Sequence, residues 1–214
     1  MIGLIFDLDG TLIDSAPDIQ FAVNQMLASE GQYPLDLPTV TSFVGQGLPK
    51  LVERVIRHVG LNPDHHTRLV DSTLSHYHTG HSQTRLYPDV LEALQGFQSA
   101  GHPMGLCTNK PIVPTEEVLK SVGLEHFFKS VICGDSLPTR KPDPAPLMKV
   151  AADIRSATFL YIGDSETDAE TAERAKVPFL LYTEGYRKTP LDQMRFTSSF
   201  SDFRELPALV EQLS

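Results

Sequence analysis

The first ten residues constrain the fold more than any other stretch of the chain. Residues 2–6 form a short, almost wholly apolar run, which is typical of a strand buried on both faces of a parallel sheet. The run ends at once in Asp7-Leu8-Asp9-Gly10, and since Asp and Gly are poor strand formers, this predicts a turn. Two carboxylates two residues apart project to the same side of an extended chain. Asp7 and Asp9 are therefore expected at the carboxyl end of a strand, where open α/β sheets bind ligands.

This pair of carboxylates has two interpretations. Two anions so close together repel, so either a cation joins Asp7 and Asp9 or one of them stays protonated. Both outcomes suit an enzyme, because they give a metal-held nucleophile beside a general acid. The alternative is an acidic turn after a buried strand, since Asp-Gly turns are common. Polar residues further along the chain distinguish an active-site carboxylate pair from an acidic turn.

Length and charge narrow the range of functions. The chain has 214 residues, enough for one large domain, or a domain with an insertion, around a sizeable core. Its 18 Lys and Arg against 27 Asp and Glu give a net charge of −9, which argues against nucleic acid as a partner. No apolar run reaches the length of a membrane span and no basic, apolar leader precedes the first strand, so we expect a cytoplasmic protein without a membrane partner. Cys107 and Cys133 have no metal-binding spacing and fit a reducing compartment.

The pattern of apolar residues divides the chain into two parts. Between residues 15 and 82 they recur at helical spacing and no strand is expected. Ser15 is expected to cap the first helix, with Asp18 as its capping-box partner. Expected strands and helices then alternate, with strands at residues 103–107, 129–133, 158–162 and 179–182 and helices at residues 90–97, 111–122, 145–154, 165–176 and 203–213. This order predicts an α/β protein: residues 1–14 and 83–214 form a three-layer, Rossmann-like parallel sheet core, and residues 15–82 are an inserted all-helical block.

Further polar residues stand at the ends of the expected strands or in loops on the same side. Thr108 offers a hydroxyl beside the backbone N–H of Asn109, just before a helix start that favours anions. Lys141 lies in a loop stiffened by prolines, and Asp164 and Asp168 are spaced to face one way at a helix start. Carboxylate oxygens around a small, hard cation predict Mg²⁺. A metal, a carboxylate pair, a hydroxyl with backbone donors and a lysine are the groups that phosphoryl transfer requires.

Each of these groups has a simpler explanation when it is taken alone. Thr108 is compatible with an ordinary strand end and Lys141 with a solvated loop charge. Asp164 and Asp168 are compatible with an acidic helix start. Chance does not readily bring all of them, together with Asp7, to one edge of a sheet. We therefore expect a phosphoryl-transfer site at this edge.

The motifs, in this order, resemble those of the haloacid dehalogenase superfamily, in its subgroup with a helical cap inserted after the first strand. The matching stretches are Phe6-Asp7-Leu8-Asp9-Gly10-Thr11 for the first motif, Thr108-Asn109-Lys110 for the second, Lys141-Pro142 for the third, and Gly163-Asp164 through Asp168 for the fourth. The resemblance spans the whole chain. It implies the same α/β core and cap that the apolar pattern predicts.

The resemblance also implies a mechanism. Asp7 would attack phosphorus and form an aspartyl-phosphate, while Asp9 would protonate the leaving oxygen and later activate water. Asp7, the backbone carbonyl of Asp9, and Asp164 would ligate Mg²⁺. The residues that would hold the phosphoryl oxygens and the nucleophile are Thr108 and Lys141, with Asn109 and Asp168 around them. The acid at Asp9 argues against the dehalogenase branch, whose chemistry needs no acid there.

Three stretches are most similar to the phosphoglycolate phosphatases of this superfamily. They are Phe43-Val44-Gly45-Gln46-Gly47, Thr108-Asn109-Lys110-Pro111 and Arg140-Lys141-Pro142-Asp143-Pro144-Ala145-Pro146-Leu147. The resemblance implies a small phosphorylated substrate, 2-phosphoglycolate, whose carboxylate needs a cation. Gly45 and Gly47 let the backbone approach a ligand, and Arg54 and Lys50 follow this loop, so we predict that Arg54 binds the carboxylate. The alternative for Arg54 and Lys50 is two solvated helix charges.

Other functions share parts of this pattern. Phosphatases for other small esters or pyrophosphate, and sugar phosphomutases, have the same core motifs. A signalling receiver also uses Asp, Mg²⁺, Thr and Lys, but the helical insertion and Asp9 oppose it, and a catalytically dead binding module is disfavoured because no motif residue is missing. His76, His78 and His81 do not share a helix face, so no second metal is expected there. The sequence is compatible with a monomer or a homodimer.

Overall fold

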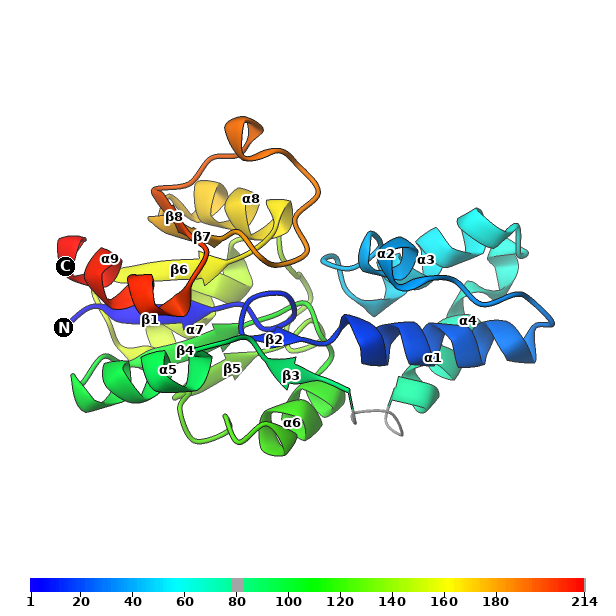
Figure 1. Cartoon of the computed structure of the whole chain (residues 1–214), viewed down its shortest axis with the longest axis horizontal. Coiled ribbons are helices and arrows are strands. Elements are labelled where there is room, and N and C mark those ends of the chain that lie inside the picture. The colour runs from blue at the N-terminus through cyan, green and yellow to red at the C-terminus, as the bar shows by residue number, and fades with distance from the viewer. Residues whose placement is uncertain (78–82, 214) are drawn as a thin grey trace.

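A computed structural model describes residues 1–77 and 83–213 of the chain. Figure 1 shows two parts: a sheet with helices on both faces, and a separate block of helices beyond the carboxyl ends of the strands. The first strand lies inside the first part, and the chain passes directly from it into the helical block. This is the α/β architecture that the apolar pattern predicts, with a parallel sheet core and a helical insertion.

The sheet has six strands, all parallel to their neighbours, in the order β5-β4-β1-β6-β7-β8. The strands are β1 (Gly3–Phe6), β4 (Met104–Cys107), β5 (Ser130–Ile132), β6 (Phe159–Gly163), β7 (Phe179–Tyr182) and β8 (Ser198–Phe200). The strand β1 is central and pairs with β4 on one side and β6 on the other. Helices cover both faces of the sheet at this strand, which explains why its sequence is continuously apolar rather than alternating.

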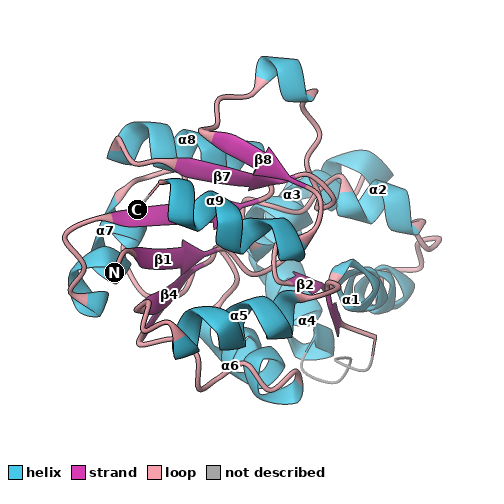
Figure 2. Ribbon diagram, turned by 60° about the vertical axis from the view of Figure 1, so that its left-hand side comes forward, coloured by secondary structure: helices cyan, strands magenta, loops and turns pink. Residues whose placement is uncertain are grey.

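Successive residues of β1 face opposite helical layers. Leu4 and Phe6 pack with α5 (Val90–Ser99), α6 (Ile112–Ser121) and α9 (Leu206–Gln212). Ile5 faces the other side, where α7 (Ala145–Ile154) and α8 (Glu166–Ala175) cover the sheet, as Figure 2 shows. These three side chains of β1 are fully buried, and burying each contributes roughly 1.5–3 kcal/mol to folding. The central strand is therefore held firmly between the two helical layers.

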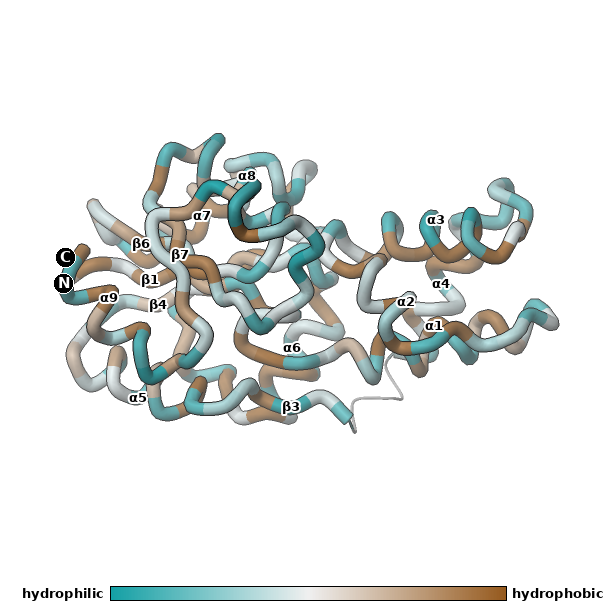
Figure 3. The backbone as a smooth tube through the Cα atoms, turned by 45° about the horizontal axis from the view of Figure 1, so that its top comes forward, coloured by the Kyte–Doolittle hydropathy of each residue, from teal (hydrophilic) through white to brown (hydrophobic). Residues whose placement is uncertain are grey.

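The helical block has a hydrophobic core of its own. Its helices are α1 (Ala16–Ser29), α2 (Leu37–Thr41), α3 (Leu48–Val59) and α4 (His66–Tyr77), the last preceded by a 3₁₀ turn over Pro63–His65. Met26, Val52 and Leu69 are fully buried in the cluster they share, which is separate from the two clusters that flank the sheet. Apolar and polar stretches alternate along these helices (Figure 3). The block is thus held together by amphipathic helices packed on one another.

Two short strands join this block to the sheet. The strand β2 (Ile13–Asp14) pairs antiparallel with β3 (Arg85–Leu86), so the chain enters and leaves the block side by side. Asp18 of α1 strengthens the junction, because its carboxylate accepts hydrogen bonds from the backbone N–H groups of residues 83 and 84 and from the Thr84 hydroxyl. The expected boundary after residue 82 falls in residues 78–82, outside the described part of the chain, as do His78 and His81.

The expected capping box at the start of α1 is wrong. Ser15 makes no side-chain cap, and its hydroxyl donates to Asp9 instead, at 2.6 Å. The Asp18 carboxylate accepts hydrogen bonds from Thr84, 66 positions along the chain. A contact over this separation cannot be predicted from the local sequence. A tertiary hydrogen bond has replaced a local one in both cases. The replacement at Ser15 places a hydroxyl on a residue of the expected active site.

Two other differences from the expected elements are small, one in the last strand of the sheet and one in the helical block. The strand β8 was not expected, because Ser198 and Ser199 have low strand propensity and the strand pairs only with β7. The apolar pattern favours a short helix over residues 39–44, but α2 starts at Leu37, since Asp36 caps it through the N–H of Thr39 at 2.9 Å. None of the described helices combines the length and the hydropathy needed to cross a membrane.

Candidate active site

The carboxyl ends of β1, β4 and β6 place three polar residues together. Phe6 is paired with Leu106 and with Ile162, so the residues that follow these strands come out at the same edge of the sheet. They include Asp7, Thr108 and Asp164, all buried. The loop before α7 adds Lys141, and the first turn of α8 adds Asp168. The structure therefore brings together the core residues that the motifs predict.

Three of these side chains form a buried carboxylate cluster. Asp7, Asp164 and Asp168 each offer an oxygen, and these oxygens lie within 4.8 Å of one another. Burial, together with the charge of Asp168, raises the pKa of Asp7 to about 7. Burial, with the charges of Asp168 and Asp7, raises the pKa of Asp164 well above its ordinary value. Three buried anions this close need positive charge between them.

Lys141 supplies part of that charge. Its Nζ lies 2.8 Å from Asp7 Oδ1 and 2.7 Å from Asp168 Oδ1, and it donates to the Tyr161 hydroxyl at 3.0 Å. Burial opposes ionisation of Asp168, but the Lys141 charge and hydrogen bonds from Lys141, Ser165 and Tyr161 hold the pKa of Asp168 below its ordinary value. Asp168 therefore anchors Lys141, and Lys141 in turn contacts Asp7.

The remaining oxygens fit a small divalent cation. Asp164 is oriented by the Thr11 hydroxyl, which donates to Oδ1 at 2.8 Å, and by the N–H of Tyr186, which donates to Oδ2 at 2.7 Å. Asp7 Oδ1 is buried, and its one contact with a donor group among the described residues is the ion pair with Lys141 Nζ at 2.8 Å. Oriented carboxylate oxygens with unused acceptor capacity are the donor set that Mg²⁺ prefers.

Gly10 allows this cluster to form. Its φ angle is +88°, in the region that favours glycine, so the turn after Asp9 follows from the residue type. A Cβ at this position would lie 2.4 Å from Asp164 Oδ2. Gly10 thus lets the first motif and the fourth approach each other closely.

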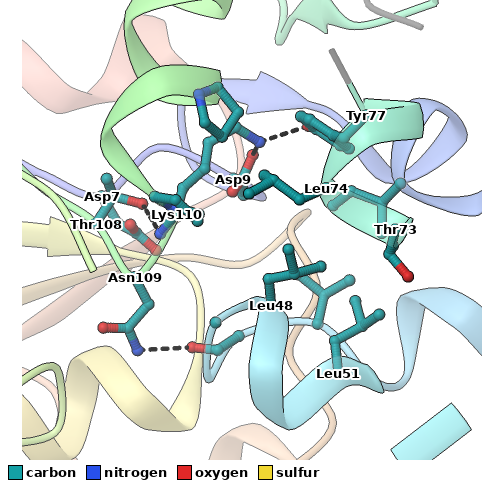
Figure 4. Close-up of a pocket in the computed structure, with 16 residues that line it drawn as sticks. Asp7, Asp9, Leu48, Leu51, Thr73, Leu74, Tyr77, Thr108, Asn109 and Lys110 are labelled. Atoms are coloured by element: carbon teal, nitrogen blue, oxygen red, sulfur yellow. Dashed lines mark hydrogen bonds and ion pairs between the residues drawn. The ribbon is translucent and has the colours of Figure 1, made fainter. Parts of the chain in front are cut away.

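Asp9 is held beside the cluster by two donors. Its Oδ1 accepts hydrogen bonds from the Ser15 hydroxyl at 2.6 Å and from Lys110 Nζ at 2.9 Å. Lys110 Nζ also donates to the hydroxyl of Tyr77, the last residue of α4, at 2.5 Å, and lies 4.4 Å from the centre of its ring (Figure 4). Both of these hydrogen bonds go to Oδ1, and none to Oδ2 occurs within residues 1–77 and 83–213. The carboxylate is thus oriented from both parts of the molecule.

Sequence reasoning missed two residues of this site. Lys110 stands in the second motif but was given no role, although its position two residues after Thr108 was a usable signal. Tyr186 lies far along the chain: its hydroxyl donates to Asp14 and accepts from the N–H groups of Ser15 and Ala16, while its own N–H holds Asp164. It links the carboxylate cluster to the junction with the helical block. No local pattern marks such a residue.

Residues of the sheet domain hold the loop that contains Gly45 and Gly47 by hydrogen bonds to its backbone carbonyls. The amide of Asn109 donates to the Gly45 carbonyl at 3.2 Å and to the Lys141 carbonyl at 3.0 Å. Lys188 donates to the Val44 carbonyl at 2.8 Å. These contacts place the loop over the carboxylate cluster, where Gly45 and Gly47 line a cavity together with Asp7, Asp9, Thr108 and Asn109.

Arg54 does not reach this cavity. Its guanidinium donates to the Phe43 carbonyl at 2.8 Å and to the Gln46 side chain at 2.6 Å, so it braces the same loop from the side of the helical block. Lys50 forms an exposed ion pair with Glu53 at 2.7 Å. The expected carboxylate-binding cation is therefore not brought to the site. The loop folds back over the first two turns of α3, and this turns the Arg54 side chain toward the loop.

The walls of the cavity differ on its two sides. The sheet supplies the polar groups, and the helical block supplies mainly apolar ones, among them Ile19, Val44, Leu48, Leu51 and Leu74 (Figure 4). Among the described residues that line the cavity, Lys110 is the only cation. The cavity therefore combines an acidic wall from the sheet with a mainly apolar wall from the helical block.

A parallel sheet with this insertion and this carboxylate cluster defines a class of hydrolase. The model of the haloacid dehalogenase-like hydrolase family matches residues 4–182, and the chain belongs to this family. Phosphoglycolate phosphatases from Cereibacter sphaeroides (strain ATCC 17029 / ATH 2.4.9) and Rhodobacter capsulatus are 45% and 47% identical to it. These alignments cover 100% and 97% of this chain and 99% and 96% of the relatives. The protein is a phosphatase.

Solved structures agree with the fold. A crystal structure described as a predicted phosphoglycolate phosphatase from Haemophilus somnus 129PT is 28% identical, with a TM-score of 0.92 over 97% of both chains. CbbY from Rhodobacter sphaeroides, solved in complex with phosphate, is 17% identical, with a TM-score of 0.83 over 96% of both chains. The second likeness concerns the fold alone.

Proposed function

We propose that the protein is a Mg²⁺-dependent phosphatase that hydrolyses 2-phosphoglycolate through an aspartyl-phosphate on Asp7. The observation that supports this most strongly is the pair Asp7 and Asp9. One carboxylate lies in the buried cluster against Lys141, and the other lies outside it with one oxygen left to exchange a proton. Full-length relatives named phosphoglycolate phosphatases support the choice of substrate.

The residues divide the reaction between them. A carboxylate oxygen of Asp7 forms the bond to phosphorus while the ester oxygen leaves with a proton from Asp9. Asp9 then takes a proton from water, whose oxygen attacks the same phosphorus and restores Asp7. Thr108 and Lys141 hold the phosphoryl oxygens, and Lys141 also fixes the nucleophile by the 2.8 Å contact.

The metal would be held by Asp7, Asp164 and the backbone carbonyl of Asp9. When bound, it supplies charge neutralisation for the phosphoryl group. Asp168 accepts hydrogen bonds from Lys141, Tyr161 and Ser165. Its role is therefore to position Lys141 rather than to bind the metal directly. We further propose that residues 15–82 act as a cap that closes over the substrate, since the Asn109 and Lys188 contacts hold its loop on the core.

A panel of phosphate esters tests the proposal. Phosphate release should be measured from 2-phosphoglycolate, pyrophosphate, a sugar phosphate and an aryl phosphate, with Mg²⁺ and with EDTA. We expect the highest kcat/KM for 2-phosphoglycolate and loss of activity with EDTA. A higher kcat/KM for pyrophosphate or the sugar phosphate would overturn the substrate, and phosphorylation without steady release would indicate a receiver.

Stabilisation by Mg²⁺ should depend on pH. In the metal-free protein the pKa values of Asp7 (about 7) and Asp164 are raised by burial above their unfolded values. Their stabilising effect is therefore complete below the unfolded pKa and is lost as pH rises through the folded one. Metal binding requires the charged forms. The rise in Tm on adding Mg²⁺ should be at least about 3 °C larger at pH 8 than at pH 5, since 1 kcal/mol shifts Tm by about 2–4 °C at this size.

Thermal unfolding of wild type and Asp164→Asn, with Mg²⁺ or EDTA at both pH values, measures this effect. The variant should lose most of the Mg²⁺-dependent shift. Its metal-free form should also be less sensitive to the rise in pH, because one repelling carboxylate is gone. A shift of equal size at both pH values, or one that survives in the variant, would contradict the ligands named here.

Arg54→Ala tests the position of Arg54 in the structure. The variant loses two hydrogen bonds that brace the loop over Gly45 and Gly47. We expect kcat/KM to fall by about 3- to 10-fold for 2-phosphoglycolate and by a similar factor for an aryl phosphate, since each lost hydrogen bond costs about 0.5–1.5 kcal/mol. A loss confined to 2-phosphoglycolate would show that Arg54 binds the carboxylate after all.

A further inference from the structure

The buried ammonium group of Lys110 lies in the wall of the cavity. Lys110 is 6% exposed, and its backbone N–H donates to the Thr108 hydroxyl at 3.2 Å, which fixes the start of its side chain beside the phosphoryl site. Burial opposes the charged form, but the Asp9 carboxylate and the Tyr77 hydroxyl outweigh burial and raise the pKa of Lys110 above its ordinary value. Lys110 is thus a permanent positive charge at this point.

Within the described part of the chain, the ammonium group uses two of its three donors. An ammonium carries three N–H bonds. Two of them are used, by Asp9 Oδ1 at 2.9 Å and by the Tyr77 hydroxyl at 2.5 Å. No third partner occurs among residues 1–77 and 83–213. A buried charged group with an unused donor facing a cavity is suited to bind an anionic ligand.

The other cations near the cap are placed elsewhere. Arg54 is used by the Phe43 carbonyl and Gln46, and Lys188 by the Val44 carbonyl. Arg140 lies beside Gly47, where a Cβ would be 3.2 Å from its Nη1, but with Lys50 it lines a second groove and not this cavity. Among the described residues that line the cavity, an anionic group on the leaving part of a substrate would therefore meet one cation, Lys110, and on the cap side mainly apolar side chains besides Thr73 and Tyr77.

The distances match a short phosphorylated acid. In the proposed reaction Asp9 contacts the leaving oxygen, and Lys110 Nζ is hydrogen-bonded to that same carboxylate. In 2-phosphoglycolate a single carbon separates the ester oxygen from the carboxyl carbon. A leaving oxygen at Asp9 therefore brings the substrate carboxylate within reach of the ammonium group. Tyr77, from the last turn of α4, closes the far side.

We propose that Lys110 binds the carboxylate of the substrate and so selects phosphorylated acids of two carbons over neutral phosphate esters. This inference rests on the proposed function and names the residue that determines its specificity. Lys110 contacts both Asp9 and the substrate, so it links recognition of the carboxylate to the position of the acid. The cap contributes through the Tyr77 hydroxyl, which orients the ammonium group from above.

Two neutral variants of Lys110 separate charge from positioning. Lys110→Gln keeps an N–H donor near Asp9 and removes the charge, and Lys110→Met removes both. Each is assayed on 2-phosphoglycolate and on 2-hydroxyethyl phosphate, which also has two carbons but carries an uncharged CH2OH group in place of the carboxylate. We expect both variants to lose about 10- to 100-fold more kcat/KM on 2-phosphoglycolate than on the neutral ester, the range for one hydrogen bond between charged groups.

Control variants and outcomes complete the test. Tyr77→Phe keeps the ring under the ammonium group and removes only its hydroxyl, so it should change kcat/KM for both esters by a similar, smaller factor. Circular dichroism establishes that each variant is folded, and Lys110→Arg, which keeps the charge, should retain a preference for the acid. Equal losses on the two esters in Lys110→Gln would overturn the inference. A wild-type enzyme without preference for 2-phosphoglycolate would instead overturn the proposed substrate.

Discussion

Asp7→Asn should abolish turnover while the protein stays folded. Asp7 is the carboxylate that ends the central strand, faces Lys141 at 2.8 Å and belongs to the metal cluster, so nucleophile and ligand are lost together. We expect kcat to fall by at least about 10³-fold, the scale seen when one essential stabilising group is removed. Steady-state release of phosphate from 2-phosphoglycolate measures the effect.

The fold should tolerate this change. The pKa of Asp7 is raised to about 7 by burial, so the site already favours an uncharged group in the absence of metal. Circular dichroism and thermal unfolding with EDTA should show a variant at least as stable as wild type at neutral pH. Near-normal activity in the folded variant would exclude Asp7 as the nucleophile.

Asp9→Asn should have the second largest effect. The amide oxygen can still accept from Ser15 and Lys110, so the geometry is preserved while the proton is lost. We expect kcat to fall by about 10²–10⁴-fold on 2-phosphoglycolate, the usual range of general acid–base catalysis. The loss should be smaller on an aryl phosphate, whose good leaving group needs little protonation.

The comparison of the two esters separates two roles for Asp9. A penalty that shrinks on the aryl phosphate supports acid assistance to the leaving oxygen. A penalty of the same size on both esters would mean that Asp9 acts mainly in dephosphorylation or in holding the metal. The assignment of Asp9 as the acid of the first step would then be wrong.

The sequence was sufficient to predict which residues meet at the ends of the strands. Asp7, Thr108 and Asp164 directly follow buried, apolar runs, and parallel strands bring such residues to one edge whatever their separation in the chain. The helical block could be predicted for a similar reason, since its amphipathic periodicity is local and has no strand pattern within it. The fold and the meeting of these three residues at one end of the strands therefore follow from local signals.

The rest of the site depends on contacts between distant residues. Lys110 acquires its role from Asp9, 101 positions away, and Tyr186 from Asp14, 172 positions away. Arg54 was placed correctly in a helix, but its direction depends on how the loop before that helix folds back. Ser15 likewise bonds to Asp9 rather than capping α1. Periodicity and propensity do not contain this information.

The most direct test of the account is a search for the phosphoryl group on Asp7 during turnover. The enzyme is mixed with 2-phosphoglycolate and Mg²⁺, quenched in acid on the millisecond scale, digested, and examined by mass spectrometry. The account predicts that the segment containing Asp7 gains the mass of one phosphoryl group in wild type, and that this gain is absent in Asp7→Asn. Release of phosphate in the burst phase with no phosphorylated Asp7, or with the phosphoryl group on another residue, would contradict it.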